Sequence, residues 1–437
     1  NPNPNPNPSP NPYFKMAQML SAISTPPVAA VFDAPPLPGD AAGEVLRLVA
    51  VNDVYKIENY PKLSMLVEAV KAHAAEAGRG RTRVLCTLAG DFLSPCILSS
   101  LDGGKAMGEV LDHVPVDVVC FGNHEFDVNL PMLRTLYTTY GGAWLNGNVL
   151  SPQLEGLPDY QLIELDGRII VHSGFTTDDI GSYRPGLGLQ IEEPVAAMKR
   201  VWDAACAECA AAGRPAPAAF LPLTHLDVPG DVHCATALAA HAPTAGRAPI
   251  ILGGHDHEVS VSEPPGTGTT IIKTGQDAEN AAIVDIYFDA EGALKARHEL
   301  VSLAAFDAGA EAAIAAAKAD SCEVSGVPKT PRRACDGDGP PRAGVKACAA
   351  YVARQSHLLD SIMGCELMRL PKPMSSLKVR YEPSDLATLL LTKIKAGLCD
   401  VEVAIMQGGA VRGKKDYEAG PFTMHDLMRE LAFPTFM

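Results

Sequence analysis

The sequence has no long hydrophobic run and few basic residues. None of its apolar stretches approaches the ~18 residues needed to cross a membrane, so no transmembrane segment is predicted. Lysine and arginine number 36 against 51 acidic residues, which gives a formal net charge of −15. Nucleic-acid-binding surfaces require stripes of basic side chains, so nucleic acid is not an expected partner. A small phosphorylated molecule is still compatible with this charge, because bound divalent ions reverse the local field.

The chain also lacks a regular cysteine framework and a recognisable signal peptide. Its 11 cysteines are irregularly spaced, and only Cys206 and Cys209 form a Cys-x-x-Cys pair. This pair lies in an alanine-rich stretch that is predicted to be helical, so we interpret both as small apolar helix residues. An odd cysteine count without a framework is typical of a reducing compartment. The sequence leaves the compartment open, although the lack of a signal peptide favours the cytoplasm. Because the first residue is not methionine, the chain could be a processed product or part of a longer protein.

The 437 residues are enough for two or three domains of ~150 residues each. Residues 1–43 are rich in asparagine and proline and are predicted to form an extended arm and linker, which serves as a spacer or as a docking segment. Residues 44–305 alternate predicted strands and helices before a run of strands, a pattern typical of α/β proteins with packed layers.

The remainder of the chain is predicted to contain a linker and a second domain. Residues 306–360 form the linker, with an insertion rich in proline, glycine and basic residues that we interpret as a flexible loop rather than a cross-linked or metal-binding insert. Residues 361–437 are predicted to form a partial α/β domain, with a helix over 383–396 and a strand over 401–406.

Polar segments follow several of the predicted strands. They are Asn52-Asp53-Val54-Tyr55, Gly90-Asp91, Gly122-Asn123-His124-Glu125-Phe126-Asp127, Thr224-His225 and Gly253-Gly254-His255-Asp256-His257. Loops after strands place polar side chains at one edge of a sheet, where open α/β folds bind ligands. Aspartate, asparagine and histidine together suit divalent metals such as Zn, Mn and Fe. The pattern therefore favours a hydrolase that acts on phosphate esters.

In their order and spacing, these segments resemble the calcineurin-like metallophosphoesterases, and within them the 5′-nucleotidase and UDP-sugar hydrolase branch. The resemblance covers residues 46–302, with a weaker continuation after residue 362. It implies a four-layer αββα sandwich of two mixed β-sheets, followed by a partial 5′-nucleotidase C-terminal substrate domain. It also implies hydrolysis of a phosphate monoester, in the manner of a 5′-nucleotidase acting on a nucleotide, by attack of metal-activated water on phosphorus.

The resemblance assigns a role to each motif residue. It implies two divalent ions (Zn, Mn, Mg or Fe), both bound by a bridging Asp91. The ligands of the first ion would be Asp53 and His257, and those of the second would be Asn123, His225 and His255. His124 would orient the substrate phosphate and stabilise the transition state, and Asp127 would hold His124 in place. Asp256 would have a supporting role.

The first motif departs from the family pattern, because Tyr55 stands where the Asp-x-His motif has histidine. Tyr55 could bind metal as a phenolate, water could replace the missing ligand, or the first ion could be lost. We expect that both ions are retained and that the first site is weakened or changed in metal preference. The sequence favours Tyr55 as a packed or hydrogen-bonding residue at least as strongly as Tyr55 as a ligand.

The resemblance extends to the substrate side and leaves other functions open. Arg380 and Arg412 resemble nucleotide-contacting arginines, and Phe433 lies where a base-stacking aromatic is expected. Gln407 replaces the usual asparagine of this region. One alternative is a weak or inactive pseudoenzyme that acts as an assembly subunit through the N-terminal arm or the insertion. Another is a cyclic-nucleotide phosphodiesterase.

Overall fold

The computed structural model describes residues 23–24, 32–77, 82–319, 344–397, 402–406, 408, 411 and 413–431. It divides into two compact units, Asn1–Ala353 and Arg354–Met437. The boundary falls within helix α9 (Val345–Met363). Within the part of the chain that is described, every helix is too short or too polar to cross a bilayer.

A six-stranded sheet in the first unit carries the first three motifs. Its strand order is β13-β12-β2-β3-β4-β5. The strands are β2 (Ala41–Val51), β3 (Thr82–Ala89), β4 (Val118–Cys120), β5 (Ala143–Leu145), β12 (Asn280–Asp289) and β13 (Leu294–Ser302). Strands β2 to β5 are parallel, whereas β12 and β13 are antiparallel to their neighbours. The carboxyl ends of β2, β3 and β4 therefore lie at the same edge.

A seven-stranded sheet carries the other two motifs. Its order is β1-β10-β11-β9-β8-β7-β6. The strands are β1 (Ile23–Ser24), β6 (Tyr160–Leu165), β7 (Arg168–Thr176), β8 (Pro217–His225), β9 (Ile250–Gly253), β10 (Val259–Ser262) and β11 (Thr270–Thr274). Strands β7, β8, β9 and β11 are parallel. Between β6 and β7, Asp166 and Gly167 have φ values of 48° and 74°, the positive values that a type I′ hairpin turn requires.

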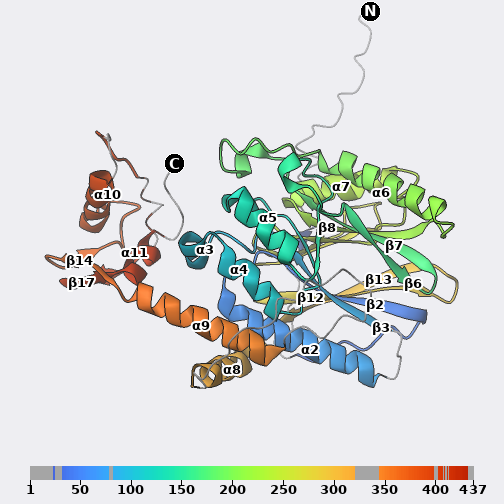
Figure 1. Cartoon of the computed structure of the whole chain (residues 1–437), viewed down its shortest axis with the longest axis horizontal. Helices are drawn as coiled ribbons and strands as arrows, with labels where there is room; N and C mark the ends of the chain where they lie inside the picture. The colour runs from blue at the N-terminus through green and yellow to red at the C-terminus, as the bar shows by residue number, and fades with distance from the viewer. Residues whose placement is uncertain are drawn as a thin grey trace, which may run out of the picture. The chain divides into compact units, whose positions relative to one another are not determined.

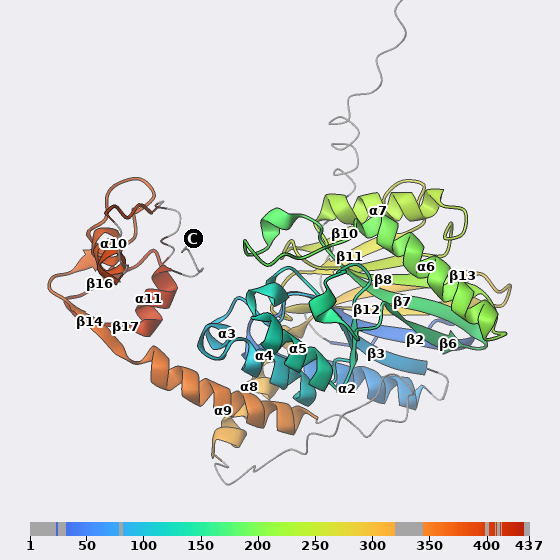
Figure 2. The same ribbon diagram turned by 45° about the horizontal axis from the view of Figure 1, so that its top comes forward.

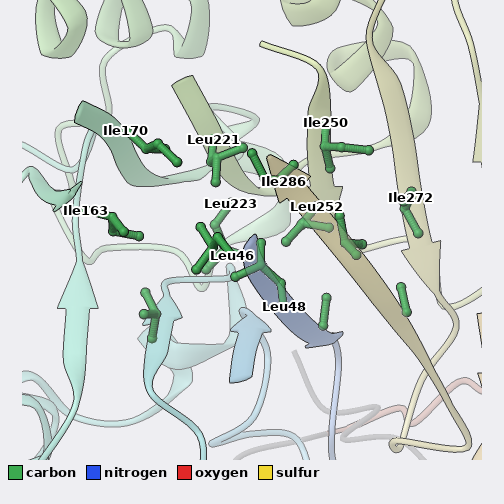
Figure 3. Packing of buried hydrophobic residues seen from close by; sticks show 14 of the residues in the cluster. Leu46, Leu48, Ile163, Ile170, Leu221, Leu223, Ile250, Leu252, Ile272 and Ile286 are labelled. Atoms are coloured by element: carbon green, nitrogen blue, oxygen red, sulfur yellow. The ribbon is translucent and has the colours of Figure 1, made fainter. Parts of the chain in front are cut away.

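The two sheets pack face to face through an apolar core. Leu46 and Leu48 of β2 lie close to Leu223 of β8, Leu252 of β9 and Ile286 of β12 (Figure 3). Along β2 these buried leucines alternate with Arg47, as the two-residue period of a strand requires. Burial of this layer fixes the register of the strands, because a shift by one residue would turn the apolar side chains out of the core.

Helices cover the outer faces of both sheets (Figures 1 and 2). On the seven-stranded sheet, α6 (Pro194–Ala211) and α7 (Val228–Ala240) bury Trp202 and Leu238 against Phe220 of β8. The six-stranded sheet is covered by α2 (Tyr60–Glu76), with α3 (Ile97–Asp102), α4 (Lys105–Val110) and α5 (Leu130–Thr139) on the same side. The predicted four-layer αββα sandwich is therefore confirmed.

Helical structure also occurs in the segment that we predicted to be a linker. Helix α8 (Asp307–Ala319) lies against α2, and α9 begins at Val345. In α9, Cys348 is buried, and the Tyr351 ring stacks on His113 at a centroid distance of 4.7 Å. The intervening insertion, with Cys322 and Cys335, lies outside the described residues.

The second unit is a small α/β assembly with its own core. Two short strand pairs, β14 (Glu366–Leu370) with β17 (Gly420–Thr423) and β15 (Met374–Ser375) with β16 (Asp416–Tyr417), accompany the helices α10 (Asp385–Gly397) and α11 (Met424–Glu430). Leu386, Leu390 and Phe422 are buried among them. The strand predicted over 401–406 is wrong for its described part, 402–406, which pairs with no other described segment. Val403 and Ile405 are 69% and 90% exposed there, so their apolar character does not reflect burial in a sheet.

Candidate metal centre

The six predicted metal ligands come from five strand ends at one edge of the sandwich. Asp53, Asp91 and Asn123 follow β2, β3 and β4, His225 ends β8, and His255 and His257 follow β9. Because these strands are parallel within their sheets, their carboxyl ends bring the six side chains together. We describe them as two halves that share Asp91: a first half with Asp53 and His257, and a second half with Asn123, His225 and His255.

The first half contains a compact group of potential ligand atoms. Asp53, Asp91 and His257 each offer one such atom, and these three atoms lie within 4.8 Å of one another. His257 Nε2 is 3.2 Å from Asp53 Oδ1. Both aspartates are buried, whereas the His257 side chain is 41% exposed. Two carboxylates and an imidazole at these distances are a donor set that fits a divalent ion.

Tyr55 places its hydroxyl among these three atoms. The Tyr55 oxygen is 3.2 Å from Asp53 Oδ1, 3.1 Å from Asp91 Oδ2 and 3.0 Å from His257 Nε2. Burial, followed by the charges of Asp91 and Asp53, raises the Tyr55 pKa far above its ordinary value. In this structure Tyr55 is therefore a neutral phenol that is hydrogen-bonded within the first half.

The second half presents an imidazole nitrogen that is oriented for coordination. His225 Nδ1 lies 2.8 Å from the Ala89 carbonyl, so this nitrogen donates its proton and a neutral ring keeps a lone pair on Nε2. His225 Nε2 is buried without a hydrogen bond among the described residues, 3.2 Å from Asp91 Oδ2. Histidine that donates one ring N–H to a carbonyl is the usual arrangement of a metal ligand. His255 Nδ1 is 3.1 Å from Asn123 Oδ1, which completes a donor set that fits a second ion.

The second half contains a buried charge pair. Burial disfavours the charged form of Asp91, but the neighbouring His225 outweighs it and lowers the Asp91 pKa to about 2. Burial likewise disfavours the charged form of His225, but Asp91 and Asp53 raise its pKa to about 10. Because an imidazole binds metal only when neutral, loading of the second half must release the His225 proton.

The backbone at the ligands is unusual. Asp53, Asp91, His255 and His257 have φ values of 55°, 53°, 85° and 59°, a region that few residues other than glycine adopt. Such conformations persist only where the surrounding structure enforces them, and they cluster at functional sites. Gly254 is required for a steric reason, because a Cβ at this position would lie only 2.8 Å from Asp53 Oδ2.

Buried polar residues that the sequence analysis did not single out support the ligands. The Glu125 carboxylate accepts hydrogen bonds from the backbone N–H groups of Asp91, Phe92, Leu93 and Gly122 at 2.6–3.1 Å. Burial and the Asp91 charge raise the Glu125 pKa to about 7. Asn52 donates to Asp53 Oδ2 at 2.7 Å and accepts from the Thr274 backbone at 2.8 Å. The position of Glu125 and Asn52 inside the motifs was the sequence signal that could have indicated this supporting role.

Lys273 of β11 connects the loops of the second half from behind. Its buried Nζ donates to the carbonyls of Leu226 and Gly254 at 2.5 and 2.7 Å. It also pairs with Asp231 at 3.0 Å and with Asp256, between the two histidines. A lysine within the apolar strand Thr-Ile-Ile-Lys-Thr was the sequence signal for this contact.

His124 and Asp127 lie beside the two halves. His124 Nδ1 is 2.7 Å from Asp127 Oδ2, and the His124 backbone N–H donates to Asp91 Oδ1 at 2.8 Å. Burial lowers the His124 pKa, but the hydrogen bond to Asp127 and the Asp91 charge raise it above its ordinary value overall. The pair is thus placed next to the metal ligands with the ring orientation fixed by Asp127.

The predicted substrate residues belong to the sequence of the second unit. Arg380 is exposed and belongs to the second unit, whose structure is described separately. Arg412 and Phe433, together with Gln407, lie outside the described residues.

The fold is that of the calcineurin-like metallophosphoesterases, and the arrangement of these residues resembles the metal centre of that family. No protein-family model matches the chain. A curated relative, Protein UshA of Yersinia enterocolitica, is 25% identical over 400 residues, which cover 84% of this chain and 67% of the relative.

Three solved structures share the fold. The 5′-nucleotidase precursor of Thermus thermophilus has a TM-score of 0.56 at 18% identity, covering 89% of this chain and 74% of its own. The NAD nucleotidase of Haemophilus influenzae has a TM-score of 0.57 at 15% identity, and the match covers 89% of this chain and 74% of that protein. The sulfate thiohydrolase SoxB, also of Thermus thermophilus, has a TM-score of 0.58 at 15% identity, and the match covers 92% of this chain and 76% of that protein. Together with the relative and the motifs, they confirm the predicted resemblance to the 5′-nucleotidase and UDP-sugar hydrolase branch.

Proposed function

We propose that this protein hydrolyses phosphate monoesters of nucleotides, as a 5′-nucleotidase. The observation that carries this proposal is the convergence of Asp53, Asp91, Asn123 and three histidines at one edge of the sandwich, with the His124–Asp127 pair beside them. The nucleotide as substrate is supported by the names of two proteins that share the fold, a 5′-nucleotidase precursor and an NAD nucleotidase.

The residues of the centre would hold two divalent ions. Asp53 and His257 would bind one ion, Asn123, His225 and His255 would bind the other, and Asp91 would contact both. When bound, such ions supply Lewis acidity that lowers the pKa of water and neutralises charge on phosphoryl oxygens. Zn, Mn, Mg and Fe are all compatible with this mixture of carboxylate, amide and imidazole ligands.

His124 has the chemistry to act on the phosphoryl group itself. Asp127 accepts the Nδ1 proton, so Nε2 is the nitrogen that can donate to a phosphoryl oxygen. A raised His124 pKa favours the protonated ring, which stabilises negative charge that develops in the transition state. The hydrogen bond from the His124 backbone N–H to Asp91 keeps His124 next to the metal ligands.

Hydrolysis assays on the metal-depleted and reloaded chain test this proposal. We expect 5′-AMP to be hydrolysed after addition of Mn²⁺ or Zn²⁺, with release of inorganic phosphate, and His124→Ala to lose most of this activity while it keeps its metal. A matched variant, His233→Ala, replaces an exposed histidine of α7 and should leave turnover unchanged.

Metal binding without hydrolysis of 5′-AMP or of an aryl phosphate would reject the proposed enzymatic function and favour the assembly-subunit alternative. Hydrolysis of a cyclic nucleotide in place of 5′-AMP would favour the phosphodiesterase alternative.

A further inference from the structure

We propose that the Tyr55 hydroxyl competes with the metal ion for the first half of the centre, so that the second half loads first and more tightly. This inference rests on the proposed two-ion function and concerns how the two positions differ. It assigns Tyr55 a positioning role at the metal site.

The Tyr55 oxygen lies where an ion of the first half would be expected. It is 3.0–3.2 Å from one atom each of Asp53, Asp91 and His257. These are the residues that form the compact ligand group of the first half. A divalent ion requires the same atoms at ~2.0–2.2 Å, so the hydroxyl and the ion cannot both occupy the middle of the group.

The tyrosine is held in this position from two further directions. Its backbone N–H donates to Asp277 Oδ1 at 3.0 Å, and the Asp277 N–H in turn donates to the Asp53 carbonyl at 2.7 Å. The Tyr55 ring meets the His257 ring edge-on at a centroid distance of 5.5 Å. An ion that enters the first half must therefore move an anchored side chain and replace its hydrogen bonds.

No comparable obstacle occurs in the described surroundings of the second half. His225 Nε2 is buried, has no hydrogen bond there and faces the shared ligand Asp91 at 3.2 Å, and His255 Nδ1 contacts Asn123 Oδ1, its proposed partner in coordination. The His225 and His255 rings meet at a centroid distance of 5.1 Å. Metal binding in the second half therefore requires no displacement of another side chain.

Metal titration of the chelator-treated chain tests the inference directly. With Mn²⁺ as the probe, we expect two ions per chain that bind in two steps, with affinities that differ by ~10-fold or more, the range typical of changes next to a metal ligand. Tyr55→Phe removes the competing hydroxyl and should tighten the weaker step. Tyr55→His supplies an imidazole in its place and should tighten it further. Tyr381→Phe, at a residue that is 88% exposed, is the matched control and should leave both steps unchanged.

The outcomes separate this inference from the proposed function. Two steps of equal affinity that Tyr55→Phe does not alter would overturn the competition while leaving a two-ion enzyme in place. A Tyr55→Phe variant that loses the weaker ion would also overturn it, because the hydroxyl would then be a ligand. A chain that binds no Mn²⁺ or Zn²⁺ would instead reject the proposed function. Tyrosine absorbance difference spectra, which should change only during the second step in the wild-type chain, provide a readout that is independent of catalysis.

Discussion

The two halves of the candidate metal centre are built from the same kind of strand ends, yet they differ in burial and in what fills them. His225 of the second half is completely buried and donates its other ring proton to a carbonyl, whereas His257 of the first half is 41% exposed. In the first half the Tyr55 hydroxyl donates a hydrogen bond to Asp91, whereas in the second half His225 and Asp91 form a charge pair. The two halves thus differ in the exposure of their histidines as well as in the Tyr55 hydroxyl that contacts the first.

The comparison also shows why burial alone does not make a metal site. Asp53 is as buried as His225, but its Oδ1 contacts Tyr55 and His257, and its Oδ2 accepts hydrogen bonds from Asn52 and from the His255 backbone. Its carboxylate is therefore satisfied without an ion. Such satisfied groups lose hydrogen bonds when an ion binds, whereas His225 Nε2 has no hydrogen bond among the described residues and lies closest to the shared ligand Asp91.

The largest effect is expected from Asp91→Asn, because Asp91 serves both halves. We expect turnover to fall by more than ~10³-fold, since loss of a single charge-stabilising group alone typically costs ~10²–10³-fold. Metal content by elemental analysis should fall as well. Asp203→Asn, on the exposed face of α6, is the control. Full metal content and wild-type turnover in Asp91→Asn would show that the shared position is wrongly assigned.

Removal of one histidine from each half tests their inequality. We expect His225→Ala to lower turnover on 5′-AMP by ~10²–10³-fold, because the tightly bound ion loses a buried ligand. His257→Ala should lower turnover by only ~10-fold, because His257 is a partly exposed ligand and the ion that it contacts is already expected to bind weakly. The measurement is kcat with added Mn²⁺, together with metal bound per chain after dialysis. Equal losses in the two variants would contradict the difference between the halves.

His124→Ala should act on neither half and therefore leave both ions in place. We expect kcat to fall by ~10²-fold, within the range for loss of a positioned proton donor. Asp127→Asn should cause a smaller loss of the same kind, because His124 remains but its ring is less firmly oriented. Metal content should match the wild-type chain in both variants. A drop in metal content would indicate that His124 supports the ligands instead of the substrate.

Much of the fold was predictable because local patterns agree with the tertiary structure. Each polar motif follows a run of β-branched or apolar residues, and these runs are strands whose ends meet at one edge. Helix α7 was not predicted, since its small residues show no clear polar face, and Cys234 and Ala235 are buried against the sheet. The strand over 401–406 was predicted from apolar residues alone, and Val403 and Ile405 prove to be exposed.

The composition of the centre was predictable, but its internal contacts were not. Spacing places Asp53, Asp91 and the histidines at the same edge, as parallel strands require. The backbone of Tyr55 is held by Asp277, which comes from a distant loop and belongs to no motif. Lys273 likewise reaches the loops of the second half from β11 through contacts that no local period indicates. Side-chain direction and long-range pairing decide these contacts, and a linear pattern carries neither.

The smallest effect that distinguishes the halves is the pH dependence of stability without metal. The His225 pKa is raised to about 10, so the native chain keeps a proton that the unfolded chain releases above its ordinary value of 6.5. The native state then binds more protons than the unfolded state, and the unfolding free energy should fall as pH rises from about 7 to about 9, by at most ~1.4 kcal/mol per pH unit for this group. Urea denaturation of the chelated chain measures this slope.

His225→Gln should flatten the pH dependence of the unfolding free energy more than His257→Gln does, because the partly exposed His257 is held less firmly in its charged form. His233→Gln, at an exposed position, should leave the slope unchanged, and a wild-type slope in His225→Gln would show that the buried pair does not hold this proton.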